Sequence, residues 1–167
     1  MTPSFEELIE RHHDELFAYL WRLLGPERGS DAALDVEDLI QEVFLRAYGS
    51  YEQLRPNSNP RAWLYRIATN HAFTQLRRVK KRRERASALR HLATKSGDAG
   101  GRADLTASMK TLVGTLPAKQ KTCVTLRYLQ DLDYSEIAEI LNCTQAGARA
   151  NVHQAIQRLR SALKEKP

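Results

Sequence analysis

The residues best suited to chemistry lie between positions 59 and 85, where polar, aromatic and basic side chains share one stretch with helical spacing. At about 100° per residue, Arg66, Asn70 and Arg77 fall on one side of the predicted helix. Residues 77–85 hold seven basic residues and a single acid. Such a helix end attracts polyphosphate, and aromatic rings beside it could stack on unpaired bases. The aromatic candidates are Trp63, Tyr65 and Phe73.

The other side of this helix is apolar, which predicts packing against a core. Asn59 suits the cap position, and Pro60 suits a first turn in which the missing N–H has no cost. The aromatic residues could instead belong to the core and the arginines to a solvated face. The whole set taken together favours nucleic acid. The packing residues are Leu64, Ala68, Ala72, Leu76 and Val79.

Side chains that catalyse reactions or bind metals do not form a recognisable site in the sequence. It has no Gly-rich phosphate loop, nucleophile elbow or catalytic pair of carboxylates. His153 has no histidine, cysteine or carboxylate three or four residues away. Cys123 and Cys143 lack metal-ligand spacing with the five histidines, so we expect both to be buried and reduced. The sequence therefore predicts a protein that is not an enzyme and uses no cofactor or metal.

Composition favours folded helical domains with an uneven charge. The chain has 167 residues, 42% of them hydrophobic, and a net charge of +6. Residues 1–60 carry twelve acids and five bases, or −7, and residues 61–167 carry eight acids and twenty-one bases, or +13. The acidic and basic parts should therefore face different partners. Without a long apolar run or signal-peptide features, we expect a cytoplasmic protein with no membrane insertion.

The acidic first part predicts two helices before the central one. Ser4 and Glu7 form a capping box for the first helix, which ends at Leu24 before a Gly-Pro pair. Asp35 caps the second helix. The polar side of that second helix is either a solubility surface, which charge alone favours, or a docking surface for a basic groove. This polar side carries Asp38, Gln41, Glu42 and Arg46.

The last part of the chain predicts a separate helical domain. Residues 86–104 read as a flexible linker because 93–104 are small, polar and rich in glycine. Four helices follow in residues 105–167, and the third and fourth form a helix-turn-helix pattern. Asp133 caps the third helix, Asn142 ends it in a left-handed turn and Thr144 caps the fourth. The side chains expected to face a DNA groove are Arg149, Asn151, His153, Gln154 and Arg158.

These segments resemble the bacterial RNA polymerase sigma factors of the extracytoplasmic-function (ECF), sigma-70-like family. Three motifs carry the resemblance in this order: DVEDLIQEVFLRAY at 35–48, NPRAWLYRIATNHAFTQLRR at 59–78 and DYSEIAEILNCT at 133–144. The resemblance implies an all-α protein with a promoter-melting domain and a helix-turn-helix domain. We assign these to residues 1–85 and 105–167, joined by the 86–104 linker.

The resemblance also implies roles for individual residues and partners. The DLIQE segment would dock on the clamp helices of the largest subunit of core RNA polymerase. This implied role replaces the interpretation of that polar side as a solubility surface. The flap region of the polymerase would be a second contact. The resemblance implies promoter DNA as the other main partner and an anti-sigma factor as a possible further partner. The docking residues would be Asp38, Gln41 and Glu42. The minus-ten residues would be Asn57, Ser58, Asn59, Arg61, Trp63, Arg66, Asn70 and Arg77. The five groove-facing residues of the last helix would read the minus-thirty-five element.

The start of the last helix departs from the family pattern. Family members usually carry Gly-Thr-Val and then Lys-Ser-Arg there, whereas residues 146–151 read AGARAN, and Gln154 stands where arginine is common. Fewer cationic side chains weaken phosphate and guanine contacts, so we expect an unusual or relaxed upstream preference. The main alternative is a free-standing helix-turn-helix regulator that binds duplex DNA without polymerase, which would leave the acidic face and the central helix unexplained.

Overall fold

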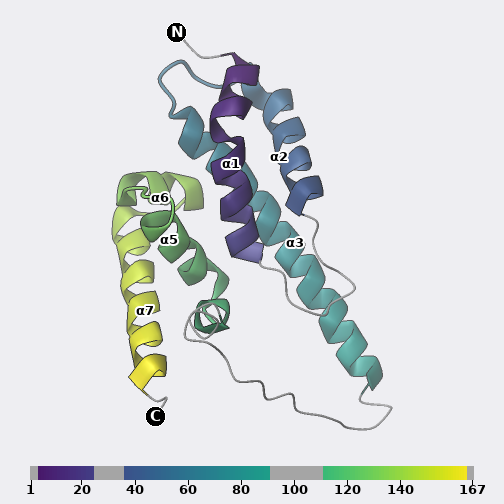
Figure 1. Cartoon of the computed structure of the whole chain (residues 1–167), viewed down its shortest axis with the longest axis vertical. Coiled ribbons are helices and arrows are strands. Elements are labelled where there is room, and N and C mark those ends of the chain that lie inside the picture. The colour runs from purple at the N-terminus through teal and green to yellow at the C-terminus, as the bar shows by residue number, and fades with distance from the viewer. Residues whose placement is uncertain (1–3, 25–35, 91–110, 165–167) are drawn as a thin grey trace.

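Helices account for nearly all of the regular structure in the computed structural model, which describes residues 4–24, 36–90 and 111–164 (Figure 1). These three ranges contain no strand, so the all-α prediction is confirmed. Within them no helix combines the length and apolarity that crossing a membrane requires. Residues 111–114 are helical. The longer helices are α1 (Phe5–Leu24), α2 (Val36–Tyr51), α3 (Pro60–Arg90), α5 (Ala118–Tyr128), α6 (Tyr134–Leu141) and α7 (Gln145–Lys164).

Helices α1, α2 and α3 pack against one another and form the first half of the molecule. The expected capping box starts α1, because the backbone N–H of Glu7 donates to Ser4 Oγ at 3.2 Å and that of Ser4 donates to Glu7 Oε2 at 3.1 Å. Asn59 caps α3 by accepting the Ala62 N–H at 3.1 Å, and Pro60 is the first residue of that helix. The apolar side of α3 lies in the core, with Leu64, Ala68 and Ala72 fully buried.

Helices α5, α6 and α7 form the second half, in which α6 and α7 make the predicted helix-turn-helix. Asp133 caps α6 in a capping box with Glu136. Asn142 ends α6 with a φ of 49°, in the left-handed region that asparagine tolerates. Thr144 Oγ1 accepts the Gly147 N–H at 3.0 Å and so caps α7. The predicted roles of Asp133, Asn142 and Thr144 are thus confirmed.

The Asp133 cap gives a direct test of this local reasoning. Replacing Asp133 by alanine removes the acceptor that lies 2.8 Å from the Glu136 N–H, and such a loss costs about 1 kcal/mol. We expect the midpoint of urea unfolding to fall accordingly, with helix content in water unchanged. Glu139→Ala, an exposed change on the same helix, is the control. Equal midpoints for the two variants would show that the cap does not stabilise α6.

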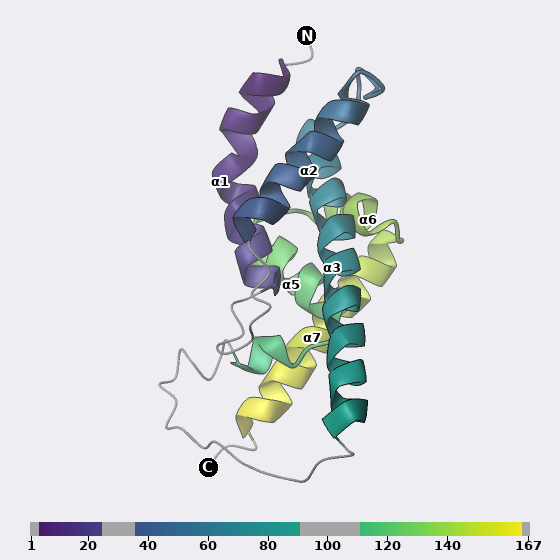
Figure 2. The same ribbon diagram turned by 90° about the vertical axis from the view of Figure 1, so that its right-hand side faces the viewer.

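The two halves share one hydrophobic core, because α1 packs against α5 and α3 packs against α6 (Figures 1 and 2). The Tyr65 hydroxyl donates to Gln130 Oε1 at 2.9 Å, and Arg61 Nη2 donates to the Gln130 carbonyl oxygen at 3.1 Å. Lys121 Nζ donates to the Leu23 carbonyl oxygen at 2.8 Å. Cys123 and Leu126 of α5 are fully buried in the same core. The first turns of α3 are therefore covered by the second half.

Three expectations differ from the structure or fall outside it. Helix α3 runs to Arg90, so residues 86–90 are helical and do not begin a linker. Cys123 is buried as expected, whereas Cys143 is exposed because it follows the left-handed turn that ends α6. Asp35 and the segment 91–110, which includes the rest of the expected linker, lie outside the described residues.

Candidate functional site

The outward face of α3 brings together the polar residues that the sequence placed on one side. Arg66, Asn70 and Arg77 are all exposed. Thr74 lies among them, where its hydroxyl donates to the Asn70 carbonyl oxygen at 3.0 Å and accepts from Arg77 Nη2 at 3.4 Å. The side chains required to hold an acidic polymer therefore share one solvent-facing surface, as the spacing predicted.

The aromatic residues of α3 divide between the core and the surface. Tyr65 is fully buried, its ring centroid 5.1 Å from that of Tyr19, so the prediction that it could stack on a base is wrong. Burial raises the pKa of Tyr65, and its hydroxyl stays protonated as a donor to Gln130. Trp63 is half-buried against Tyr51, at 6.2 Å between centroids. Phe73 is also half-buried, so these two rings retain partly accessible faces.

A hollow of 410 Å³ lies where α1 meets the loop before α3. Ser58, Asn59 and Arg61, all predicted minus-ten residues, line it. Arg11 and His12 of α1 form another wall, which sequence reasoning missed because only the packing of α1 against α3 brings them there. Its remaining lining residues are Leu8, Leu54, Arg55, Pro56 and Pro60. Asn57 is exposed in the same loop but is not among the lining residues.

Arg61 is engaged by a carboxylate inside the protein. Its Nη2 lies 2.8 Å and its Nε 3.1 Å from the two oxygens of Glu15, whose Oε1 also contacts His12 Nδ1 at 2.5 Å. Burial opposes ionisation of Glu15, but the hydrogen bonds from Arg61 and His12 outweigh it and lower the pKa of this carboxyl. Arg61 thus braces the hollow, and its guanidinium is less available to a ligand than that of Arg66.

Asn59 links the hollow to the second half of the chain. Besides its cap bond to Ala62, its Nδ2 donates to Glu136 Oε1 of α6 at 3.1 Å. Both polar groups of this predicted minus-ten residue are therefore occupied in the structure. Glu136 also belongs to the capping box of α6, so a single carboxylate joins the start of α3 to the start of α6.

The acidic side of α2 is exposed at Asp38, Gln41 and Glu42. Glu42 Oε2 lies 2.7 Å from Nε2 of His71, a buried residue of α3 that the sequence did not single out. Burial lowers the pKa of His71, nearby Arg46 adds to this effect and Glu42 opposes it. At neutral pH the contact therefore joins a neutral imidazole to the carboxylate. His71 fixes one end of the acidic face relative to α3.

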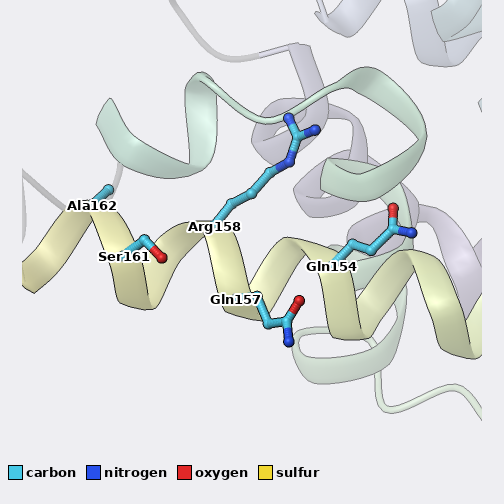
Figure 3. A pocket seen from close by; sticks show the side chains of 5 residues that line it. All are labelled: Gln154, Gln157, Arg158, Ser161 and Ala162. Atoms are coloured by element: carbon cyan, nitrogen blue, oxygen red, sulfur yellow. The ribbon is translucent and has the colours of Figure 1, made fainter.

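The predicted reading side of α7 is largely exposed. Arg149, His153, Gln154 and Arg158 face solvent, whereas Asn151 is half-buried and its Nδ2 donates to the Gly147 carbonyl oxygen at 2.9 Å. Figure 3 shows Gln154 and Arg158 extending from the same side of α7, beside a hollow of 380 Å³ that is also lined by Gln157, Ser161 and Ala162.

Two of these side chains are held by neighbours. The Arg149 guanidinium lies 5.0 Å from the centre of the Tyr134 ring, and Gln154 Oε1 accepts from Gln120 Nε2 at 3.0 Å. In the described part of the chain no group of three or more histidine, cysteine or acidic side chains is placed to hold a metal ion.

Known protein families match each half of the chain. Residues 8–83 match the family model for sigma-70 region 2, and residues 107–159 match that for sigma-70, region 4. The ECF RNA polymerase sigma-E factor of Escherichia coli (strain K12) is 30% identical over an alignment that covers 72% of this chain and 70% of that protein. The chain belongs to the ECF RNA polymerase sigma factor family. This sigma factor acts with core RNA polymerase in promoter-specific transcription initiation, and the alternative of a free-standing regulator is not favoured.

Other comparisons extend the similarity over nearly the whole sigma factor. The ECF RNA polymerase sigma factor SigW of Bacillus subtilis is 26% identical, with 97% of this chain and 90% of that protein covered. The sigma factor RpoE of Bartonella quintana, solved in complex with the anti-sigma factor NepR, aligns over 98% of both chains with a TM-score of 0.71. Its sequence is 24% identical, which supports a shared fold. The region 2 match ends at residue 83, whereas α3 continues to Arg90.

Proposed function

We propose that three surfaces of this sigma factor divide the work of initiation. The acidic side of α2 docks on core RNA polymerase, the outward face of α3 with the loop before it binds the minus-ten element, and α7 binds the minus-thirty-five element. The shared exposure of Arg66, Asn70 and Arg77 opposite a buried face is the observation that carries this division. The protein performs no catalytic step of its own and acts in the cytoplasm with the polymerase.

Strand opening follows from the geometry at the start of α3. Extruding a base from a duplex costs a few kcal/mol, and stacking on an aromatic face can return about 1–3 kcal/mol per base. We assign the flipped base to the hollow beside Asn57, Ser58 and Asn59, with Arg11 and His12 as its far wall. The half-buried Trp63 of α3 offers an aromatic ring for stacking. Arg66, Asn70 and Arg77 then hold the separated strand and the duplex just upstream.

Docking on polymerase is assigned to Asp38, Gln41 and Glu42. The first sixty residues carry a net charge of −7, which suits a basic groove such as the clamp helices of the largest subunit. The contact between His71 and Glu42 fixes one of these carboxylates relative to α3. Fixing it reduces the side-chain entropy lost on docking, and it relates the docking surface directly to the helix that binds DNA.

The second half is assigned to the upstream duplex and to the flap region of the polymerase. Arg149, His153, Gln154 and Arg158 supply exposed donors and acceptors suited to a major groove. An anti-sigma factor is a further proposed partner. RpoE of Bartonella quintana shares this fold, and its solved structure is a complex with the anti-sigma factor NepR.

The decisive experiment adds the purified protein to a bacterial core RNA polymerase together with a library of randomised promoters. A sigma factor should confer initiation at a selected sequence that neither component shows alone. Binding of selected duplexes by the protein alone, with no effect of polymerase, would instead indicate a free-standing regulator. Selection of this kind also yields the two promoter elements needed for the tests below.

Arg149 gives a specific prediction for the upstream element. Its position near the start of α7, where family members read bases, leads us to expect that Arg149→Ala changes the preferred minus-thirty-five sequence at one or two positions. One bidentate contact is worth about 1–3 kcal/mol of base discrimination. The measurement is a second selection with the variant. Since Arg149 also covers Tyr134, a thermal melt should verify the fold. An unchanged preferred sequence would show that Arg149 reads no base.

A further inference from the structure

The last turns of α3 form an exposed cationic extension of the bundle. Every residue from Lys80 to Leu89 is exposed, and this end of α3 extends past the ends of α1 and α2 in both views (Figures 1 and 2). Glu84, the single acid between Arg77 and Arg85, lies 3.9 Å from Lys80. An exposed pair of this kind contributes little to stability, so packing does not account for the concentration of charge.

The charges of this extension continue the face already assigned to the minus-ten strand. At about 100° per residue, Arg66, Asn70, Arg77, Lys81 and Arg85 fall within an arc of about 100° on α3, and all five are exposed. From Arg66 to Arg85 the helix rises about 28 Å at about 1.5 Å per residue. That length corresponds to about eight base pairs of duplex at about 3.4 Å each. One straight rod can therefore follow DNA beyond the separated strand.

We propose that Lys81 and Arg85 bind the phosphate backbone of the duplex upstream of the minus-ten element, in the spacer between the two promoter elements. This rests on the proposed function, because it requires Arg66, Asn70 and Arg77 to set the direction of the DNA along α3. Charge complementarity identifies the ligand as an acidic polymer. Continuity of the face with the minus-ten residues favours duplex DNA over RNA. Contacts to phosphate position the DNA and carry no sequence preference.

The test uses holoenzyme and a promoter obtained by selection, with binding measured between 50 and 200 mM salt. Lys81→Gln with Arg85→Gln should remove two phosphate contacts, each worth about 0.9 in the slope of log affinity against log salt. Across that range the affinity of the unmodified protein should then fall about tenfold more than that of the variant. Glutamine retains a good helix propensity, and circular dichroism checks that α3 persists.

A matched variant separates position from net charge. Arg82→Gln with Arg83→Gln removes the same number of charges from two exposed positions that lie about 110° and 150° from the centre of that face, and its salt slope should stay close to that of the unmodified protein. A promoter fragment whose duplex ends at the upstream edge of the minus-ten element should remove the difference between the two variants. Equal slopes for the two variants on the full promoter would overturn the proposal.

Two other outcomes are equally informative. A difference that persists on the shortened fragment would show that Lys81 and Arg85 bind the minus-ten DNA itself and not the upstream duplex, and would also overturn the proposal. Failure of the unmodified protein to direct polymerase to any promoter would refute the proposed function itself. Holoenzyme formation, measured separately without DNA, distinguishes these cases because neither variant alters the acidic side of α2.

Discussion

Reversing the charge of Asp38 and Glu42 together should reduce binding to core RNA polymerase at least about a hundredfold. The double variant Asp38→Arg, Glu42→Arg places two cations on the surface assigned to a basic groove, and like charges brought together at an interface cost several kcal/mol. About 1.4 kcal/mol corresponds to a factor of ten in affinity. Fluorescence anisotropy of labelled protein titrated with core polymerase measures the effect.

A matched variant on α1 controls for the change in net charge. Glu6→Arg with Glu10→Arg makes the same reversal at two exposed positions that are also four residues apart. This variant should bind polymerase within about threefold of the affinity of the unmodified protein, since exposed charges away from an interface act only through screened long-range fields. Thermal melts check that both proteins remain folded. Undiminished binding by the Asp38, Glu42 variant would remove the docking assignment from α2.

Truncating the outward face of α3 should impair promoter opening far more than attachment to polymerase. Asn70→Ala with Arg77→Ala removes one amide and one guanidinium from the face assigned to the separated strand. A hydrogen bond to a charged group contributes about 1.5–3 kcal/mol, so we expect at least a tenfold loss in the fraction of open promoter. Permanganate reactivity of unpaired thymines, measured at saturating holoenzyme, reports this fraction.

The control for this pair also lies on α3. Gln75→Ala with Arg83→Ala removes the same kinds of group from another side of the helix and should leave permanganate reactivity unchanged. Affinity for core polymerase should be the same for both variants. If opening remains intact in the Asn70, Arg77 variant, the exposed face of α3 does not hold the strand, whatever its charge.

Local features of the fold could be read from the sequence because they depend on neighbours within one turn. The caps at Ser4, Asn59, Asp133 and Thr144 all form as expected, and Asn142 adopts the left-handed conformation. The end of α3 could not be placed in this way. After Arg85 the apolar spacing that marks a packed helix stops, yet α3 continues as an exposed rod to Arg90.

The error at Tyr65 has a physical cause that a helical wheel partly reveals. Tyr65 falls between Ala72 and Leu76 on the wheel, so its angle already favours the packed side. What completes its burial is Gln130, which comes from the second half and bonds the hydroxyl. Contacts between residues so far apart leave no periodic signal, and the same holds for the bond from Asn59 to Glu136 and for the approach of His71 to Glu42.

On the proposed assignments, the packing of α3 against α6 opposes simultaneous binding of the two promoter elements. The minus-ten and minus-thirty-five elements are named for positions 25 base pairs apart, which corresponds to roughly 85 Å of B-form DNA. The helices assigned to them, α3 and α7, nevertheless belong to halves that share one core. On the proposed assignments the halves part before both elements are bound, so the apparent affinity for the promoter is the intrinsic value scaled by the fraction of molecules already parted. Among the described residues Gln130 Nε2 is buried and finds no acceptor. Hydration of this amide on parting would offset part of the cost of the hydrogen bonds that are lost.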